Sequence, residues 1–323
     1  MRQIVLEQPG RLVPGDTPPP AAGPGEALVR VRRVGVCGTD FHAFHGEQPY
    51  FTYPRVLGHE LAVEVVEAPA NDRGISAGDA CAVEPYLNCG GCHACRAGRY
   101  NCCENVRVLG VHTDGGMRQF FAVPLDHLHK SNKLSFDDLV LVEPLTIAAH
   151  AVKRSALAAS ETVLVVGAGP IGFAVTQVAL GLGARPRVIE IAPARRGRIA
   201  RLGVEVLPEP DERLADVVFD ATGSLKSMAG SLSRVAFGGR LVFVGLAQGA
   251  VSMDDPLFHR REITLLASRN SAGQFPKVIR MIEEGRIDTS PWITRRLELE
   301  QVPALFDDLT WHQEGLKTMV EVA

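Results

Sequence analysis

Five of the seven cysteines fall within fifteen residues, in the stretch CGGCHACRAGRYNCC that begins at Cys89. Such a cluster could be a disulfide staple, a redox site or a metal site. Two Cys-x2-Cys steps share one cysteine and a further thiol follows them, and four thiolates at this spacing can enclose a tetrahedral zinc ion. Two independent disulfides would be strained in so short a loop. The spacing therefore favours a structural zinc site with the ligands Cys89, Cys92, Cys95 and Cys103.

A closed site of this kind has no open position for a substrate, so metal chemistry needs a second group of ligands. Cys37 offers a thiolate in the stretch GVCGTDFHAFHG, and His59 offers an imidazole that is followed at once by Glu60. Each residue alone is a weak signal, because a lone histidine more often has a structural role. Together with the cysteine loop and a glycine-rich stretch further along the chain, they form a recognisable set, which makes a second metal site a candidate. We interpret Cys102 as a spare neighbour of the fourth ligand and Cys81 as a small buried apolar residue.

A possible nucleotide site follows in the stretch VLVVGAGPIGFAV, which has the pattern G-x-G-x-x-G between a β-branched run and a helical run. Its glycines are Gly167, Gly169 and Gly172. They let backbone N–H groups approach a pyrophosphate at the N-terminus of a helix. Glu190 ends the next predicted strand, where a carboxylate binds ribose hydroxyls and repels a 2′-phosphate, which favours NAD over NADP. Arg195 and Arg196 weigh faintly against this preference, since arginine can hold a phosphate.

The elements that must position these residues are of two kinds. Before about Pro144, short alternating runs such as ALVRVRRVGVC and ELAVEVVEA predict a β-rich part. Beyond it, strand candidates alternate with helices, which predicts a doubly wound parallel sheet. Only PEPDERL separates two of these strands, so we expect one crossover to be reduced to a turn or a single helical turn. We expect a β-rich domain over residues 1–144, a nucleotide-binding domain over residues 145–269, and a return to the first domain over residues 270–323, which begins with a helix in GQFPKVIRMIEEGRID.

These motifs together resemble those of the zinc-dependent medium-chain alcohol dehydrogenases. The resemblance rests on Cys37-Gly38-Thr39-Asp40-x-His42, Gly58-His59-Glu60, the four-cysteine loop, Glu143-Pro144-Leu145 and VVGAGPIG, with DATG and FVGL further on. It covers nearly the whole chain. It implies a GroES-like β-rich catalytic domain and a Rossmann domain, one catalytic and one structural zinc ion, and a nicotinamide cofactor.

The resemblance also implies roles for single residues at the metal. Cys37, His59 and Glu143 would bind the catalytic zinc, with Glu60 as an exchangeable ligand. A glutamate at position 143 resembles the sorbitol and threonine dehydrogenase branch, whereas the liver alcohol dehydrogenase branch has a cysteine there. Bound alcohol loses its proton more easily because the cation stabilises the alkoxide, and hydride can then leave the carbinol carbon.

Thr39 and His42 resemble the family's proton relay, in which a hydroxyl, the cofactor ribose and an imidazole pass the proton to solvent. Alternatively, Thr39 is a turn residue and His42 a surface helix residue. By the same resemblance, the cofactor contacts the glycine loop and the ends of several strands. The further residues expected there are Pro170, Ile171, Glu190, Arg195, Thr222, Leu246, Ser268 and Arg269.

Within the family, the stretches EQPYFTYPRVLGHE, VLGVHTDGG and LLASRN look most like those of bacterial sugar-acid and polyol dehydrogenases. His112 and Arg269 lie in two of these stretches, and a cation near the cleft could pair with a substrate carboxylate. We therefore expect a small polyhydroxylated substrate, with the sugar acid L-galactonate as the first candidate. Alternatively, His112 is a backbone-bonded turn residue, and Arg269 contacts the sheet edge or the cofactor.

Composition limits the other classes of function. With 46% hydrophobic residues, 22% charged residues and a net charge of −3, the chain resembles ordinary globular proteins, and no long basic run favours nucleic acid or a membrane surface. Glycines and a proline interrupt the uncharged residues 162–184, so a strand, a turn and a helix explain this stretch better than a membrane span. We expect a cytoplasmic protein, where clustered thiols more often mean metal or catalysis than disulfides.

Two further expectations concern partners and rival functions. The apolar strand ITLLASRN should lie at the edge of the parallel sheet, and an unpaired edge invites a homodimer or homotetramer. The rival functions are a non-catalytic sensor that binds zinc and NAD, a zinc-free quinone reductase, and a dehydrogenase of a simple neutral alcohol. A sensor or a quinone reductase needs no open zinc site, so the set Cys37, His59 and Glu143 favours an alcohol-oxidising enzyme.

Overall fold

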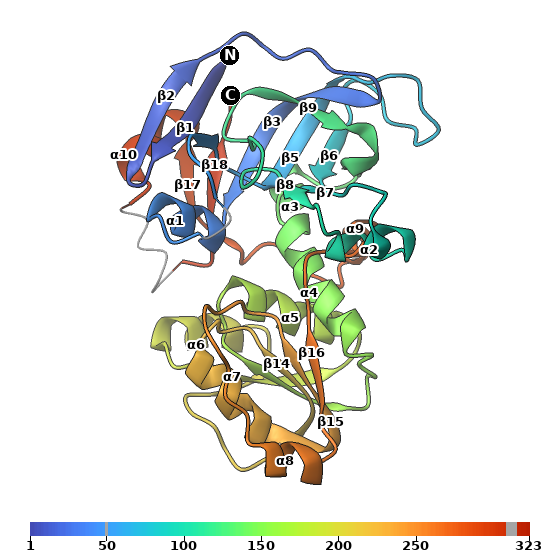
Figure 1. Cartoon of the computed structure of the whole chain (residues 1–323), viewed down its shortest axis with the longest axis vertical. Helices are drawn as coiled ribbons and strands as arrows, with labels where there is room; N and C mark the ends of the chain where they lie inside the picture. Colours follow the sequence, from blue (N-terminus) through green and yellow to red (C-terminus); the bar gives the residue numbers. More distant parts are fainter. Residues whose placement is uncertain (49–50, 308–314) are drawn as a thin grey trace. The chain divides into compact units, whose positions relative to one another are not determined.

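The computed structural model describes residues 1–48, 51–307 and 315–323, so Pro49 and Tyr50 of the stretch EQPYFTYPRVLGHE lie outside the described residues. The chain divides into two compact units (Figure 1). The first contains Met1–Glu143 and Thr289–Ala323, and the second contains Pro144–Asp288. Among the described residues, no helix combines the length and the apolar character that a membrane crossing requires.

The first unit is built around a large, mainly antiparallel sheet. Its strands are β3 (Glu26–Val36), β5 (Glu60–Glu67), β6 (Ala80–Val83), β9 (Phe120–Pro124), β10 (Leu128–Lys130), β17 (Ile293–Glu298) and β18 (Lys317–Glu321). Their order is β10-β6-β5-β3-β18-β17, and β9 pairs with the first half of β3. Every second residue at the start of β3 is fully buried, as in Ala27, Val29 and Val31, which is the period expected of a strand with one face on a core.

A three-stranded sheet, a two-stranded ribbon and short helices complete the first unit. The strands are β1 (Arg2–Gln8), β2 (Arg11–Asp16), β4 (Arg55–Val56), β7 (Tyr86–Leu87) and β8 (Arg107–Val108), and the helices are α1 (Gly38–Phe44), α2 (His93–Arg96), α3 (Phe136–Leu139) and α10 (Val302–Leu305). The small sheet has the order β2-β1-β4, and β7 pairs with β8. Phe41 and Phe44 of α1 pack on Phe306 with ring centroids 5.0 and 5.2 Å apart. This contact anchors the helix that follows Cys37.

The second unit contains a six-stranded parallel sheet. Its strands are β11 (Thr162–Val166), β12 (Arg185–Ile189), β13 (Glu205–Leu207), β14 (Ala215–Asp220), β15 (Val235–Phe243) and β16 (Thr264–Ala267). Their order is β13-β12-β11-β14-β15-β16, which in chain order is the 3-2-1-4-5-6 arrangement of a Rossmann sheet. The predicted doubly wound sheet is confirmed, and β16 lies at its edge as expected. The order reverses between β11 and β14, which is where such sheets bind dinucleotides.

Helices connect the parallel strands except at one place. The connecting helices are α5 (Pro170–Gly181), α6 (Pro193–Ala200), α7 (Leu225–Ser231) and α8 (Asp255–Arg260), while α4 (Val142–Arg154) precedes β11 and α9 (Phe275–Glu283) follows β16. Residues 208–214, between β13 and β14, contain no helix, so the predicted reduction of this crossover is confirmed. Helix α5 is buried from Gly172 to Ala179, which explains why its sequence is apolar on all sides.

The second boundary between the units differs from the sequence expectation. We expected the chain to return to the first domain at residue 270, but residues as far as Asp288, including α9, belong to the second unit. Contacts with α5 hold them there. Arg286 Nε donates to the carbonyl oxygen of Gly181 at 2.9 Å, and Gln177 donates to the carbonyl oxygen of Asp288 at 2.6 Å. The apolar pattern of residues 275–283 predicted a helix but not the surface that it covers.

Candidate metal centres and nucleotide site

Three candidate metal ligands lie together in the first unit. The ligand atoms of Cys37, His59 and Glu60 are all within 4.8 Å of one another. Cys37 directly follows β3, and His59 directly precedes β5. These two strands are antiparallel neighbours, so the ends that carry the ligands meet. Gly35 pairs with Glu60, and a Cβ atom at Gly35 would lie 2.1 Å from Glu60 Oε2. The Glu60 carboxylate therefore fits only because residue 35 is a glycine.

Asp40, in the first turn of α1, braces both ligand segments. Its carboxylate accepts hydrogen bonds from the backbone N–H groups of Cys37 at 2.9 Å and Gly58 at 3.4 Å. His59 Nδ1 lies 3.7 Å from Asp40 Oδ1 and, within the described part of the chain, is buried without a hydrogen-bond partner. Burial lowers the pKa of His59, but Asp40 and Cys37 outweigh it and hold this pKa well above its ordinary value. A buried ring nitrogen without a partner, beside a thiol and a carboxylate, suits a metal ion.

Lys317 forms a buried ion pair with Glu60 that the sequence reading missed. Its Nζ lies 2.6 Å from each carboxylate oxygen of Glu60 and 3.3 Å from the carbonyl oxygen of Val36. Burial lowers the pKa of Lys317, but the electrostatic effects of Glu60 and Cys37 outweigh burial, so the pKa is raised. The sequence offered one sign of this pair. Lys317 begins the short run KTMV, and a lysine buried in such a strand needs a partner of opposite charge.

Glu143, the expected third ligand, lies beside this group rather than within it. It is buried at the start of α4 and accepts a hydrogen bond from the Tyr86 hydroxyl. The pKa of Glu143 is raised to about 7, chiefly by burial. His59 lowers this pKa, and Glu60 raises it further. Glu143 is thus close enough to His59 and Glu60 to interact with both. Tyr86 is the second residue that the sequence reading missed.

The donor set fits zinc. Thiolate, imidazole and carboxylate are the ligands that zinc takes in proteins, and three protein ligands leave a fourth position for substrate. The assignment of Cys37, His59 and Glu143 as ligands, with Glu60 exchangeable, stays a prediction. All four residues belong to the first unit.

The two relay candidates lie on α1. Cys37 Sγ donates to Thr39 Oγ1 at 3.8 Å, so Thr39 adjoins the predicted metal ligand. His42 is exposed and its Nδ1 lies 3.0 Å from Glu47 Oε2. The helix therefore has one relay candidate beside the metal ligand and the other on its solvent face, and their roles stay predictions.

The cysteine loop holds four thiols within 4.8 Å of one another, those of Cys89, Cys92, Cys95 and Cys103. None of the seven cysteines forms a disulfide. Backbone N–H groups point at the sulfur atoms, as from Cys89 to Cys103 Sγ at 3.3 Å and from Cys95 to Cys92 Sγ at 3.4 Å. N–H groups of Gly91 and Cys92 lower the pKa of Cys89 to about 6, which favours the thiolate that binds metal. The group fits a tetrahedral structural zinc.

The glycine loop joins β11 to α5 as predicted. Gly167 has φ +91°, which favours glycine, and a Cβ atom at Gly172 would lie 1.8 Å from the Gly167 carbonyl oxygen. A side chain at either place would separate the loop from the helix. Gly169 is the N-cap and Pro170 the first residue of α5, so the loop ends at a helix N-terminus that can face a phosphate. Ile171 follows in the same turn.

Glu190 has a structural role that the sequence reading did not include. Its Oε2 accepts a hydrogen bond from Ala168 N–H at 2.7 Å, and its Oε1 accepts one from Ala192 N–H at 2.8 Å. The carboxylate thus fastens the glycine loop to the end of β12. Each oxygen keeps a second lone pair, so the contact with a ribose hydroxyl stays a prediction. Arg195 Nη1 lies 3.9 Å from the place of a Cβ atom at Gly169, beside the loop.

The other predicted cofactor contacts follow the carboxyl ends of the parallel strands. Thr222 donates from Oγ1 to Asp220 Oδ1 at 2.7 Å, and the fully buried Asp220 also accepts from Ser227 and Ser231. Leu246 follows β15 and is 85% exposed, although large apolar side chains are usually buried. Ile191, which was not among the predicted contacts, follows β12 and is 81% exposed. Ser268 follows β16 and donates its backbone N–H to Phe243 at 3.0 Å.

The two candidate substrate cations lie in different units. His112 is exposed in the turn after β8, and its Nδ1 accepts a hydrogen bond from Val108 N–H at 3.1 Å. This is the backbone-bonded turn that we gave as the alternative. Arg269 is exposed two residues after β16. A substrate contact of either residue stays a prediction.

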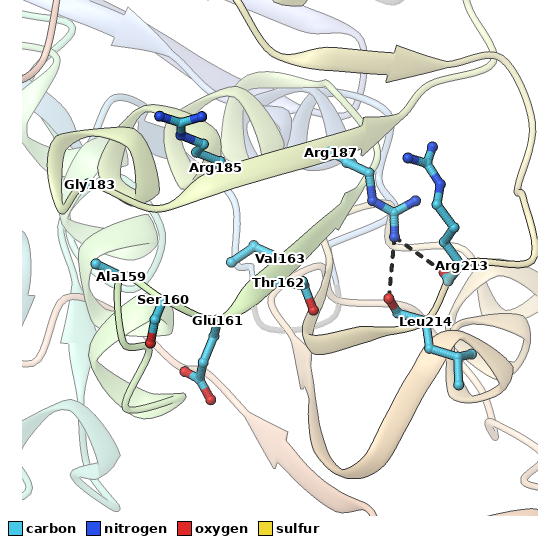
Figure 2. Close-up of a pocket in the computed structure, with 10 residues that line it drawn as sticks. All are labelled: Ala159, Ser160, Glu161, Thr162, Val163, Gly183, Arg185, Arg187, Arg213 and Leu214. Atoms are coloured by element: carbon cyan, nitrogen blue, oxygen red, sulfur yellow. Dashed lines mark hydrogen bonds between the residues drawn. The ribbon is translucent and has the colours of Figure 1, made fainter.

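A hollow of about 640 Å³ opens at the other end of the parallel strands (Figure 2). It is lined by the start of β11, the start of β12 and the residues before β14. Arg187 donates to the carbonyl oxygens of Arg213 and Leu214 at 3.2 and 3.5 Å, and to Asp211 at 3.0 Å. Because dinucleotides bind at the carboxyl ends of such strands, this hollow is not the predicted cofactor site.

Two family descriptions match the chain. The alcohol dehydrogenase GroES-like domain matches residues 23–133, and the zinc-binding dehydrogenase matches residues 170–284. The GroES-like and Rossmann-type domains predicted from the sequence are therefore confirmed.

Several known proteins are similar to this chain over nearly its whole length. L-galactonate-5-dehydrogenase of Escherichia coli strain K12 is 38% identical over 335 aligned positions, which cover 99% of this chain and 98% of the relative. A solved alcohol dehydrogenase (rspB) of E. coli CFT073, complexed with NADH, has a TM-score of 0.92 and 27% identity and covers 99% of both chains. A zinc-binding dehydrogenase of Sinorhizobium meliloti 1021, bound to NADP, has a TM-score of 0.93 and 28% identity over 99% of this chain and 98% of that one.

Proposed function

The chain belongs to the zinc-dependent medium-chain alcohol dehydrogenases, and from this premise we propose that it oxidises a secondary alcohol of a sugar acid or polyol with NAD. The observation that carries the proposal is the group Cys37, His59 and Glu60, whose ligand atoms lie within 4.8 Å of one another next to Glu143. The proposed products are a keto compound and NADH.

The metal centre would activate the substrate. Zinc bound by Cys37, His59 and Glu143 would stabilise the alkoxide form of a bound alcohol and so ease the loss of its proton. Thr39, next to the Cys37 thiol, would accept that proton at its hydroxyl while passing its own towards the cofactor ribose. His42, on the solvent face of the same helix, would release a proton to water. Lys317 would offset part of the negative charge of Glu60.

NAD is proposed over NADP because of Glu190. Its carboxylate is fixed by the N–H groups of Ala168 and Ala192, at the end of β12 where the adenosine ribose of a bound dinucleotide lies. A fixed negative charge there repels a 2′-phosphate. The solved relatives include one with NADH and one with NADP, so cofactor choice is a property of the individual chain.

The substrate proposal is a polyhydroxy acid, with L-galactonate first. It is supported by the 38% identity to L-galactonate-5-dehydrogenase of E. coli over nearly the whole chain. The substrate carboxylate would be met by Arg269 or His112. We further propose a homodimer or homotetramer that pairs along β16, the edge strand of the parallel sheet. The proposed compartment is the cytoplasm, where thiolate ligands stay reduced.

A panel of sugar acids, polyols and simple alcohols tests the proposal, with reduction of NAD or NADP followed by absorbance and zinc measured by elemental analysis. We expect two zinc ions per chain and the best activity on a polyhydroxylated substrate. Cys37→Ser should abolish activity, whereas Cys102→Ser, at an exposed cysteine outside the four-thiol group, should not. A fully zinc-loaded protein that reduces neither cofactor with any substrate would contradict the proposal, as would one zinc per chain.

A further inference from the structure

Tyr86 is buried, only 9% exposed, and its hydroxyl donates a hydrogen bond to Glu143 Oε1. A carboxylate can rotate about its last bond and can present either or both oxygens to a metal. A phenol that donates to Oε1 restricts this rotation. The Tyr86 hydroxyl can therefore influence how Glu143 faces the predicted catalytic metal.

The position of Tyr86 is set by the ribbon β7–β8. Tyr86 pairs with Val108 and Leu87 pairs with Arg107. On the preceding side, Leu109 N–H donates to the carbonyl oxygen of Pro85 at 3.0 Å. The chain between the two strands is the cysteine loop, in which Cys89 N–H donates to Cys103 Sγ at 3.3 Å. The four-thiol group therefore closes the far end of the same ribbon whose near end carries Tyr86.

We propose that Tyr86 is a positioning residue for the catalytic metal: its hydroxyl orients the Glu143 carboxylate. Tyr86 is in turn held in place by the β7–β8 ribbon, whose two strands are joined by the cysteine loop. The inference rests on the metal centre of the proposed function. Partners that orient a metal ligand are commonly worth about 10–100-fold in metal affinity. Without the hydroxyl, Glu143 Oε1 would lose its hydrogen bond in a buried place, and the carboxylate could turn away from the metal.

The test is Tyr86→Phe, which removes the hydroxyl and keeps the ring. Cobalt is used in place of zinc, because its visible spectrum reports ligand number and geometry. The cobalt signal of the catalytic centre is the part that disappears in Cys37→Ser, a change that leaves the four-thiol group intact. We expect Tyr86→Phe to shift this signal and to weaken cobalt binding, measured by competition with a chelator, by about 10–100-fold.

Tyr53→Phe is the matched control. Tyr53 is half-buried in the same unit, and its hydroxyl donates to the carbonyl oxygen of Ala43 rather than to a candidate ligand. This change should leave the cobalt spectrum and affinity as they are in the parent protein. Thermal unfolding of each variant reports any general loss of stability separately.

A second comparison keeps the test decisive if the buried carboxylate harms folding of Tyr86→Phe. In a Glu143→Ala background the carboxylate is absent, and adding Tyr86→Phe should then change cobalt affinity no further. Equal affinity and spectrum in Tyr86→Phe and the parent protein, or a full additional loss in the Glu143→Ala background, would overturn the inference. If the parent protein has no dehydrogenase activity but Tyr86→Phe still weakens cobalt binding as expected, only the proposed function is refuted.

Discussion

Lys317 Nζ lies 2.6 Å from both carboxylate oxygens of Glu60, and both side chains are only 1% exposed. The pair joins β18, close to the end of the chain, to the start of β5, and Glu60 itself has a ligand atom within 4.8 Å of those of Cys37 and His59. A buried pair of this kind adds little stability over apolar residues, but each partner depends strongly on the other. Lys317 therefore holds the Glu60 carboxylate in place.

Lys317→Met should destabilise the protein by about 3–5 kcal/mol, because it leaves the Glu60 carboxylate buried without its cation. The measurement is chemical denaturation of the zinc-loaded protein. The double variant Lys317→Met/Glu60→Gln removes both charges and should recover part of this loss. Lys130→Met is the control, since Lys130 pairs with Asp79 at 2.8 Å but is 26% exposed, and should cost at most about 1 kcal/mol. Similar losses in the free energy of unfolding for Lys317→Met and Lys130→Met would contradict the claim that burial makes Glu60 depend on Lys317.

A second charged cluster joins β3 and β17 to α3 and predicts a pH dependence. Asp137 lies 2.8 Å from Arg33 Nε and 2.5 Å from Arg296 Nη2. Arg296 and then Arg33, against the effect of burial, lower the pKa of Asp137 below its ordinary value of 3.8. A lowered folded-state pKa contributes stability that is present above the unfolded pKa and is lost as the pH falls through the folded value.

Asp137→Asn should therefore lower the free energy of unfolding by about 1 kcal/mol at pH 7, and the difference from the parent protein should shrink below about pH 4. Urea denaturation at a series of pH values between 3 and 7 measures it. Asp72→Asn, at an exposed position in the same unit, should give no such pH-dependent difference. A difference for Asp137→Asn that stays constant down to pH 3 would argue against the ion pairs as its cause.

The position of Glu190 predicts a combined effect on cofactor choice and stability. Glu190→Gln removes the charge that repels a 2′-phosphate, so the ratio of kcat/KM for NAD to that for NADP should fall by roughly tenfold. A glutamine has one acceptor oxygen for the two N–H groups of Ala168 and Ala192, so one of them is left facing an NH2 group. This should cost about 1–3 kcal/mol. Kinetics with both cofactors and thermal unfolding measure the two effects. A parent enzyme that already prefers NADP would refute the role given to Glu190.

Local patterns in the sequence predicted the parallel sheet, the β-rich part and the four-thiol group, whereas the catalytic ligand set came from the resemblance to the family. The alternation of β3, the β-branched run of β11 and the spacing of Cys89 to Cys103 are short-range features, and each determines its own segment. The missing crossover helix before β14 was also predictable, because seven residues are too few for a crossover helix and the two turns that must flank it. Such features carry their information within a few residues of chain.

What the sequence could not show were the contacts between distant segments. Tyr86 and Glu143 are 57 residues apart, and Glu60 and Lys317 are 257 apart, so no local pattern connects them. The second domain boundary was not predicted for the same reason. The apolar face of α9 shows that the helix packs on something, but not on which unit. Glu190 was identified correctly as a strand-end carboxylate, but its bonds to Ala168 and Ala192 depend on how the loop folds back.

The last prediction concerns the substrate carboxylate and which cation meets it. An imidazole that accepts a hydrogen bond at Nδ1, as His112 does from Val108, is neutral and carries its proton on Nε2. A guanidinium is always charged and can bind a carboxylate with two parallel hydrogen bonds. Between the two candidates, Arg269 should therefore contribute more to recognition of an acid than His112.

L-Galactonate should be oxidised with a kcat/KM at least about tenfold above that of the neutral polyol galactitol, which corresponds to about 1.4 kcal/mol. Arg269→Ala should remove most of this preference by lowering the value for the acid, whereas His112→Ala should reduce it only slightly. Arg260→Ala, at an exposed arginine at the end of α8, is the matched control and should leave the preference intact. The assay follows NADH formation with both substrates for the parent enzyme and the three variants. If the parent enzyme oxidises galactitol as well as galactonate, recognition of a carboxylate is refuted, and a neutral polyol becomes the better candidate for the same zinc and NAD chemistry.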